Sequence, residues 1–389
     1  MKRLLTFFLI CFSFVEYTRA EDIIDYKYWD EGKLTWDDFQ DTLSLKGVPS
    51  AFNAFLRIEK TEKRDGNTRT IRPEAQACFD KRHSFADRQI QNENVLRLFQ
   101  LKYDLLEMYR RRLQTELNLG VVGIAADNRT RQYMDLYTEQ SKKAEQETEN
   151  GQNEIKLQEW EFYVTKELIE NPAPSIPRIS PRRFGYGFYL GTGASFPVGS
   201  IADYWDPAWQ INVGFDLAYA NTHLLCDFSA GTARTRQEII VSNGQITDKW
   251  LRNGHNTYTS ISLGIGQQLI STKYFALMPY VGCIWSGYSD QAKIQEGRNE
   301  RTTLSYTNFN WTAGICFDYR FSTTISLVPS FWRGHREIFT ASIRTKLFIN
   351  REQFHNFKIA PDDNGSMLRG CKLGFSVACL GFSRLLQIK

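Results

Sequence analysis

The stretch WQINVGFDLAYA, residues 209–220, alternates strictly between two kinds of side chain. One parity is apolar and consists of Trp209, Ile211, Val213, Phe215, Leu217 and Tyr219. The other parity consists of Gln210, Asn212, Gly214, Asp216 and Ala218. Such alternation predicts a β-strand with two different faces. A tilted strand of roughly 9–11 residues can cross a bilayer, so this segment has the length of a transmembrane strand.

The same alternation recurs through the C-terminal half of the chain. FGYGFYLGTGASF (184–196) and FNWTAGICFDY (309–319) show it clearly. Weaker strands are expected at 223–234, 258–270, 274–288, 324–332 and 339–349, which makes eight. GCKLGFSVACLGFSRLL, from Gly370, also alternates. Because bacterial single-chain barrels have even strand numbers, this segment either replaces a weaker strand or raises the count to ten.

The connections between these strands are expected to alternate in length. Tight turns are predicted at 221–222, 271–272 and 322–323, and longer polar loops at 197–206, 235–254 and 289–301. This alternation is typical of outer-membrane barrels, whose long loops face outward from the cell. The connection at 333–336 is short for an outer loop and departs from the pattern.

The volume of the barrel decides which face points inward. A soluble barrel would bury the apolar parity, but eight strands enclose a space that side chains just fill. Several Phe, Trp, Ile and Leu from every strand would overpack that space, so we expect them to face lipid and the small polar parity to line a narrow lumen. Aromatic girdles near the strand ends are expected from Tyr204, Trp205, Trp209, Trp285, Tyr288 and Trp332. Residues 184–389 resemble the small outer-membrane β-barrel proteins of Gram-negative envelopes.

The first twenty residues, MKRLLTFFLICFSFVEYTRA, predict a secretory signal peptide (1–20). Its apolar run is shorter than the roughly 20 residues of a spanning helix, which disfavours the alternative of a retained anchor. Cleavage removes three basic residues and one acidic residue, so the formal charge falls from +4 to +2. A nearly neutral chain gives no electrostatic indication of nucleic-acid binding. Phosphate-loop and dinucleotide motifs are absent from the sequence, and no cofactor is expected.

Six cysteines follow the predicted signal peptide, and they are widely scattered without a CxxC pair. Free thiols, buried or facing lipid, are therefore expected. A bond between Cys371 and Cys379 is the alternative in an oxidising compartment.

A change of composition divides the rest of the chain. NPAPSIPRISPRR, residues 171–183, contains four prolines and predicts an extended linker. Before it, residues 21–170 predict an α+β domain, with strand-like stretches within 28–71 and helices from Asn92 onward. The predicted fold is thus an α+β N-terminal domain followed by an antiparallel transmembrane β-barrel.

One helix in the N-terminal half carries a family resemblance. VLRLFQLKYDLLEMYRRRL, residues 95–113, has an apolar face at Leu98, Leu101, Leu105 and Met108, and Asp104 is expected to face solvent. An earlier segment reads LTWDDF (34–39), and a later one keeps Glu147, Thr148, Gly151, Gln158 and Trp160. In this order the three segments resemble a family of predicted periplasmic zinc-dependent proteases with a helix of the form HEQxHFDIxExYxRxL. The helix here keeps Gln100, Tyr103, Asp104, Glu107, Tyr109, Arg111 and Leu113.

The resemblance departs at the positions that carry the chemistry. In a helical HExxH motif two His one turn apart bind zinc, and the Glu between them polarises the bound water. Here the two His positions fall on Leu98 and Lys102, the Glu on Phe99, and the third ligand on Asn150. Leu and Phe cannot coordinate a metal, and a protonated Lys repels one. The resemblance therefore implies a protease-like domain without catalytic, cofactor-binding or metal residues, and His83 is expected to be a surface residue.

These patterns together predict an outer-membrane-anchored pseudo-peptidase with a periplasmic N-terminal domain. Its role would be non-catalytic binding or scaffolding, and its partners would be outer-membrane lipid and periplasmic or other envelope proteins. Two alternatives stay open: an envelope enzyme with an unidentified site, and a transport or secretion component if the barrel has more strands.

Overall fold

The computed structural model describes residues 25–41, 49–242, 247–290, 306–328, 336–354 and 368–388. The predicted signal peptide, 1–20, lies outside these residues. The chain forms two compact units. Within the described part, a helical unit comprises residues up to Glu59 and Glu74–Ser175, and a barrel unit comprises Lys60–Pro73 and residues from Ile176 onward. No helix in the described ranges is long and apolar enough to span a membrane.

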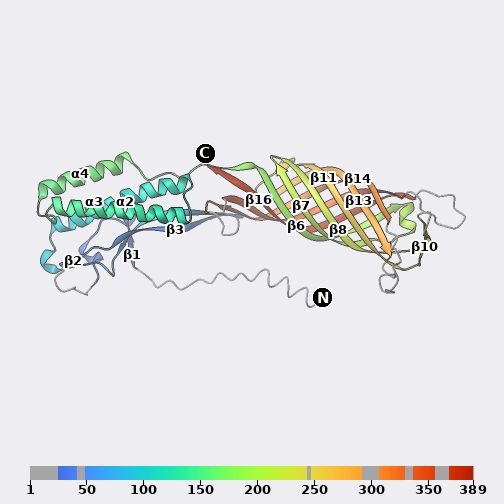
Figure 1. Ribbon diagram of the computed structural model, residues 1–389, viewed down its shortest axis with the longest axis horizontal. Helices are drawn as coiled ribbons and strands as arrows, with labels where there is room; N and C mark the ends of the chain where they lie inside the picture. Colours follow the sequence, from blue (N-terminus) through green and yellow to red (C-terminus); the bar gives the residue numbers. More distant parts are fainter. Residues whose placement is uncertain are drawn as a thin grey trace. The chain divides into compact units, whose positions relative to one another are not determined.

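The helical unit is built around three helices, α2 (Glu93–Leu119), α3 (Ile124–Glu147) and α4 (Glu154–Glu170), which lie side by side (Figure 1). The Asn92 side chain caps α2 by accepting a hydrogen bond from the Val95 N–H, and Gly120 ends it with a φ of 126°. Strand β1 (Tyr26–Tyr28) pairs with β4 (Thr68–Asp80), which also pairs with β3 (Ala54–Asp65). The buried face of α2 packs with residues of these strands into one hydrophobic core.

Short elements complete the helical unit. They are η1 (Trp29–Glu31), η2 (Trp36–Asp38), β2 (Ser50–Ala51), β5 (Phe85–Ala86) and η3 (Arg88–Ile90). Strands β2 and β5 pair with each other, away from the large sheet.

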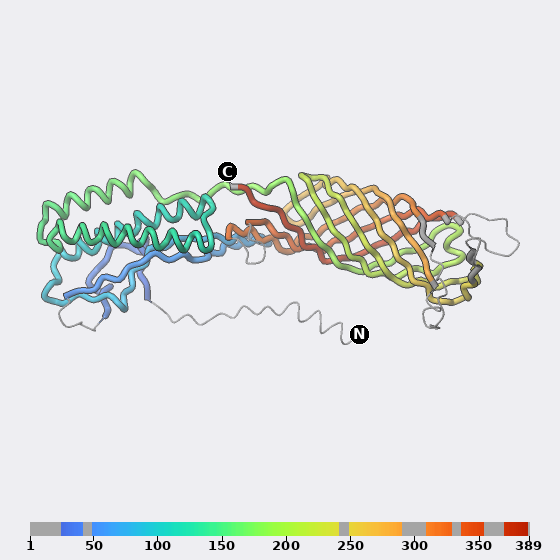
Figure 2. Tube along the Cα trace, viewed as in Figure 1, coloured from blue at the N-terminus to red at the C-terminus, as the bar shows by residue number. Residues whose placement is uncertain are grey.

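The barrel unit contains a closed ring of eight antiparallel strands, as predicted. The strands are β6 (Ile179–Gly199), β7 (Ala208–Tyr219), β8 (Thr222–Arg234), β11 (His255–Gln267), β13 (Phe275–Asp290), β14 (Tyr306–Ser326), β15 (Glu337–Phe354) and β16 (Leu368–Ile388). Each pairs with the next along the chain, and β16 pairs with β6 to close the ring (Figure 2). The first barrel strand begins within the stretch predicted as linker, 171–183.

The predicted strands 309–319 and 324–332 are not separate, since residues 309–319 and 324–326 belong to one strand, and residues 329–332 lie outside the described part. Strand β14 runs from Tyr306 to Ser326, and its register against β15 shifts between Arg320 and Ser322. The tight turn predicted at 322–323 was therefore wrong. The segment from Gly370 forms β16 and supplies the eighth strand, so ten strands are not needed.

This assignment also removes the apparent irregularity in loop length. In an up-and-down ring, alternate connections lie at the same end of the barrel. The connections 220–221, 268–274 and 327–336 form one set, whereas 200–207, 235–254, 291–305 and 355–367 form the other. The connection around 333–336 was wrongly assigned to the outer set, and residues 329–335 in it lie outside the described part. The long set includes a small hairpin, β9 (Ile239–Ser242) with β10 (Thr247–Trp250).

The barrel is apolar outside and polar inside, as the volume argument predicts. Trp209, Phe215 and Ile261 are 50–66% exposed in the isolated molecule, whereas Asn212 and Asp216 are at most 5% exposed. Of the residues predicted for the girdles, Trp209 and Trp285 are exposed on the outer face, and Tyr204 is half-buried. The girdle prediction was wrong for Trp205 and Tyr288, which are buried and stack on each other at 4.7 Å between ring centroids. Trp332 lies outside the described residues.

The six cysteines after the predicted signal peptide are free. Cys371 and Cys379 both lie on β16, eight residues apart along one extended strand. At roughly 3.3 Å per residue their Cα atoms are about 26 Å apart, far beyond the reach of a disulfide. The alternative of a bond between them is therefore excluded.

The tip of the hairpin formed by β3 and β4, residues 60–73, belongs to the barrel unit. Residues 68–71 of β4 pair in parallel with residues 323–326 of β14. The Asn67 side chain donates from Nδ2 to the backbone oxygen of Arg320 at 2.9 Å. The hairpin tip thus pairs with the edge of β14 that follows its register shift. This edge lies at the end of the barrel that carries the short connections.

A charge on the outer face should destabilise the barrel. We expect Phe215→Arg to lower the free energy of unfolding by roughly 2–4 kcal/mol, the cost of Arg at the bilayer midplane. Phe215→Leu should cost less than half of that, since it keeps the face apolar. The measurement is urea unfolding of the full chain in lipid vesicles, and equal losses for both variants would contradict a lipid-facing position.

Candidate functional site

The positions that would hold zinc chemistry in the resembled family lie on the buried side of α2. Leu98, Phe99 and Lys102 are 3%, 4% and 8% exposed. The Phe99 ring packs among Trp36, Phe39 and Phe52, with centroid distances of 6.2, 5.1 and 5.6 Å. Aromatic carbon therefore occupies the place where a water-activating carboxylate would be needed.

Lys102 has a structural partner of its own. Its Nζ forms an ion pair with Glu145 of α3 at 2.5 Å and lies 4.5 Å from the centre of the Phe52 ring. Such a contact offsets part of the cost of burying the ammonium group. The ammonium also places a positive charge where a divalent cation would have to bind.

Asn150, at the predicted third-ligand position, lies in the turn between α3 and α4. Its φ of 56° is left-handed, and its N–H donates to the backbone oxygen of Glu145 at 2.8 Å. Gly151 follows with a φ of 87°, and a Cβ there would lie 3.1 Å from the backbone oxygen of Asn94. The turn thus packs against the first turn of α2, and Asn150 itself is exposed. No group of three or more His, Cys, Asp or Glu in the described chain is arranged to hold a metal.

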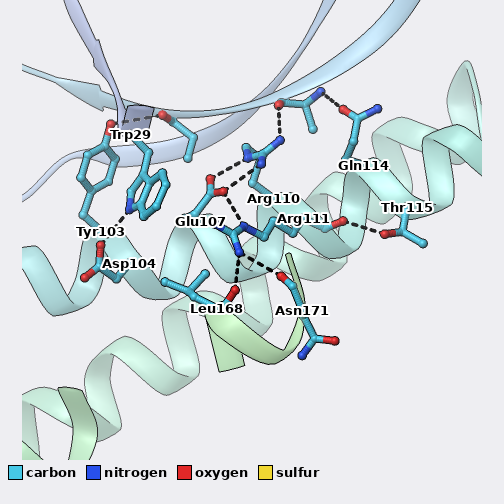
Figure 3. Close-up of polar contacts among 12 residues, drawn as sticks. Trp29, Tyr103, Asp104, Glu107, Arg110, Arg111, Gln114, Thr115, Leu168 and Asn171 are labelled. Atoms are coloured by element: carbon cyan, nitrogen blue, oxygen red, sulfur yellow. Dashed lines mark hydrogen bonds and ion pairs between the residues drawn. The ribbon is translucent and has the colours of Figure 1, made fainter. Parts of the chain in front are cut away.

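The family positions that are retained have structural contacts instead. Trp29 Nε1 and Gln100 Nε2 both donate to Asp104 Oδ1 at 2.7 Å, and Tyr103 donates to the backbone oxygen of Lys27 at 2.6 Å (Figure 3 labels Trp29, Tyr103 and Asp104). The expectation that Asp104 faces solvent was wrong. Burial raises the pKa of its carboxyl, and the two donated hydrogen bonds oppose that rise.

Glu107 is the charged centre of a second contact group (Figure 3). It is 2% exposed and accepts hydrogen bonds from Arg110 at 2.6 Å and Arg111 at 2.8 Å. Arg111 also donates to the backbone oxygens of Leu168 and Asn171, so the group joins α2 to the end of α4. These contacts explain the retained Glu and Arg by packing alone.

Two other reactive side chains of the helical unit are poor candidates for chemistry. The His83 side chain is 72% exposed and pairs with Asp80 at 2.8 Å, which confirms the surface assignment. Cys78 is fully buried, and burial raises the pKa of its thiol to about 12. A thiol with that pKa is almost entirely protonated near neutrality and is not a nucleophile.

The barrel lumen holds the densest group of charged side chains, in three layers. In the first layer Arg344 donates to Asp216 at 2.7 Å and to Asp318 at 2.7 and 2.8 Å, and His223 Nδ1 lies 2.6 Å from Asp216. All four side chains are buried or nearly so. They come from β7, β8, β14 and β15, so the layer ties strands across the barrel.

The second layer centres on Asp227 of β8. It accepts hydrogen bonds from Lys346 Nζ, from the Tyr189 hydroxyl, and from Ser262 at 3.1 Å. Tyr189 fits because its neighbour across the ladder is Gly214, where a Cβ would lie 2.2 Å from the tyrosine ring. Small residues on the lumen parity therefore make room for large ones.

The third layer pairs Lys372 with Glu352 at 2.8 Å. The Lys372 ammonium also lies 3.7 and 4.4 Å from the ring centres of Tyr258 and Tyr288. A cavity of about 30 Å³ lies beside Lys346 and Asp227, which is room for one or two water molecules. Between these layers the lumen is filled rather than open.

Sequence reasoning placed Asp216 on the lumen side but did not identify the basic partners. The available signal was Arg344 and Lys346 within SIRTKLFIN (342–350), where basic residues alternate with Ile343, Thr345 and Leu347. A strand with basic residues on its inward parity requires acidic residues on neighbouring strands, because an unpaired buried charge is costly.

No family model and no curated protein matches the chain. Among solved structures, the C-terminal half is similar to Ail, the attachment invasion locus protein of Yersinia pestis, at 10% identity and a TM-score of 0.25, covering 51% of this chain and 97% of Ail. It is also similar to OprG of Pseudomonas aeruginosa at 11% identity and a TM-score of 0.28, covering 54% of this chain and 99% of OprG. The N-terminal β-barrel domain of Pseudomonas aeruginosa OprF matches at 8% identity and a TM-score of 0.23, with coverage of 52% and 99%.

Removing one partner of a lumen ion pair should destabilise the barrel more than removing both partners. We expect Lys346→Met to lower the free energy of unfolding by about 3–5 kcal/mol, because Asp227 is left buried without its cation. Adding Asp227→Asn to the same chain should restore most of that loss. Urea unfolding in lipid vesicles gives both values, and a double variant as unstable as the sum of the two singles would contradict the pairing.

Proposed function

We propose that this protein is an outer-membrane-anchored pseudo-peptidase that acts as a non-catalytic binding or scaffolding protein. The observation that carries the proposal is the packing of Phe99 and Lys102 where catalytic zinc would need three ligands and an open position. Buried aromatic and ammonium groups leave no room there for a metal, a water and a peptide. The N-terminal resemblance to zinc proteases then concerns packing residues only.

The barrel supports the role of an anchor. Its apolar outer face suits hydrocarbon, and its strands of 12–21 residues are long enough to cross a bilayer at a tilt. The helical unit joins the barrel at the start of β6, at the end that carries the short connections. In outer-membrane barrels that end faces the periplasm, which favours a periplasmic helical unit.

The closely packed inner layers of the lumen disfavour transport. A cavity of about 30 Å³ admits water but not a solute, and the surrounding charges are already paired. A larger barrel would have favoured a transport or secretion component, but the ring has eight strands. These observations favour binding at the surface of the helical unit over transport through the barrel.

One face of α4 suits such binding. Ile155, Phe162 and Ile169 are 72%, 73% and 74% exposed and recur every seven residues. This spacing places them in one stripe along the helix, the arrangement that packs against an apolar stripe of another helix. We infer that this stripe, Ile155–Phe162–Ile169, binds an amphipathic helix of an envelope protein.

The absence of zinc chemistry is directly testable. Full-length protein expressed with added zinc should contain well below one zinc per chain and leave protein substrates uncut with or without chelator. Elemental analysis and a peptidase assay measure both, and His83→Ala serves as a control for zinc held by the exposed histidine. Near-stoichiometric zinc with chelator-sensitive cleavage would replace this proposal with an enzyme.

The binding stripe can be tested by site-specific photo-crosslinking in cells. A crosslinking residue at position 162 should capture a discrete envelope protein, whereas the same residue at Lys156, about 100° around the helix, should not. Ile155→Glu in the same chain should reduce the capture at position 162 at least fivefold. Equal capture from positions 162 and 156 would contradict a specific stripe, and a product of two copies of this chain would replace the partner by self-association.

A further inference from the structure

The barrel unit has a cavity of about 380 Å³ at the end with the short connections. Strand residues from β6, β8, β14, β15 and β16 line it, together with residues of the short connections and Thr68 of the hairpin tip. Its volume lies within the range of small-molecule pockets. It is more than ten times the volume of the cavity between the inner layers of the lumen, about 30 Å³.

The lining of this mouth cavity is strongly basic. Lys273, Arg320, Arg344 and Arg384 line it, and Asp318 is the one carboxylate among the described lining residues. Asp318 is already bound by Arg344. Within the described chain neither Arg320 nor Arg384 forms an ion pair, so two guanidinium groups border the cavity with no carboxylate within ion-pair distance.

Both of these arginines also anchor the backbone. Arg320 Nη1 donates to the backbone oxygen of Thr272 at 2.8 Å, and Arg384 Nη2 donates to that of Ala220 at 2.5 Å. Each bond uses one nitrogen of a group that has five N–H donors. The anchoring holds the guanidinium groups at the cavity and leaves donors on each for a ligand.

The inner end of the cavity is built from buried polar groups. Arg344 is 2% exposed and His223 is 5% exposed. Asp216 binds both, yet the Arg344 Nη1 and the His223 Nε2 are buried without a hydrogen-bond partner. A buried polar atom without a hydrogen-bond partner destabilises the fold, and such an atom usually binds water or a ligand.

The rest of the lining combines polar Thr, Ser, Asn and Gln side chains with a group of apolar ones. Ile325, Ile338, Leu380 and Phe382 contribute to the walls. A bare inorganic ion would leave this surface unused, whereas an organic anion would bury against it. Pockets that combine apolar walls with a few polar groups are typical of small-molecule sites.

We propose that the mouth cavity binds a small organic anion whose phosphate or carboxylate group lies between Arg320 and Arg384 and whose apolar part packs against Leu380 and Phe382. Planar guanidinium groups bind both anions through paired hydrogen bonds, which is why arginine suits this role. This site is separate from the proposed partner-binding stripe on α4, and either could exist without the other.

The test is isothermal titration calorimetry of the full-length protein in detergent micelles, with phenyl phosphate, benzoate and phenol as probes. Phenyl phosphate or benzoate should show saturable binding to one site, and phenol at the same concentration should show at least tenfold weaker binding. These measurements on the wild-type chain decide the point without any variant. Binding of phenol as tight as that of the anions, or no saturable binding of either anion, would overturn the proposal.

Variants then locate the site. Arg320→Gln and Arg384→Gln should each weaken anion binding at least tenfold. Arg351→Gln is the matched control, since this exposed arginine lies at the opposite end of β15 and loses the same charge. The band shift of unheated protein on gels checks that each barrel is folded. Equal weakening by all three variants would show nonspecific attraction and contradict the assigned position.

Discussion

The pairing of β16 with β6 is the constraint on which the rest of the structure depends. In hydrocarbon no water satisfies a free backbone N–H or C=O, so a sheet can cross a membrane only if it has no edge. The pairing runs from Gly370 opposite Gly199 to Ile388 opposite Ile179 and closes the ring. Closure with eight strands fixes a narrow interior, and this width decides which side chains can lie inside.

The narrow interior explains the layered charges. Apolar side chains occupy the outer face, so the side chains of the opposite parity must fill the interior. These are mostly small residues, with a few large polar ones. Arg344, Lys346 and Lys372 fill the space, and each lies beside at least one carboxylate. Ion pairs this deeply buried add little net stability over apolar packing, but they join strands across the barrel and fill its inner layers.

In the helical unit, the residues that match the zinc-protease pattern of the sequence make structural contacts. Asp104, Tyr103 and Glu107 hold backbone or side-chain partners from other elements, and those contacts need no metal. Phe99 extends an aromatic cluster, and Lys102 forms its own ion pair. Contacts within the fold thus account both for the positions that match the pattern and for those that depart from it.

The sequence by itself determined the barrel, its membrane-facing parity and the helix from residue 95, because periods of 2 and 3.6 are local properties of the chain. It could not place the boundary between β14 and β15, since the register shift at Arg320–Ser322 interrupts the alternation and imitates a turn. Nor could it pair Arg344 with Asp216, 128 residues away, or place the 60–73 hairpin tip with the barrel unit. Those contacts depend on which strands face each other across the closed ring, and only the tertiary structure decides that.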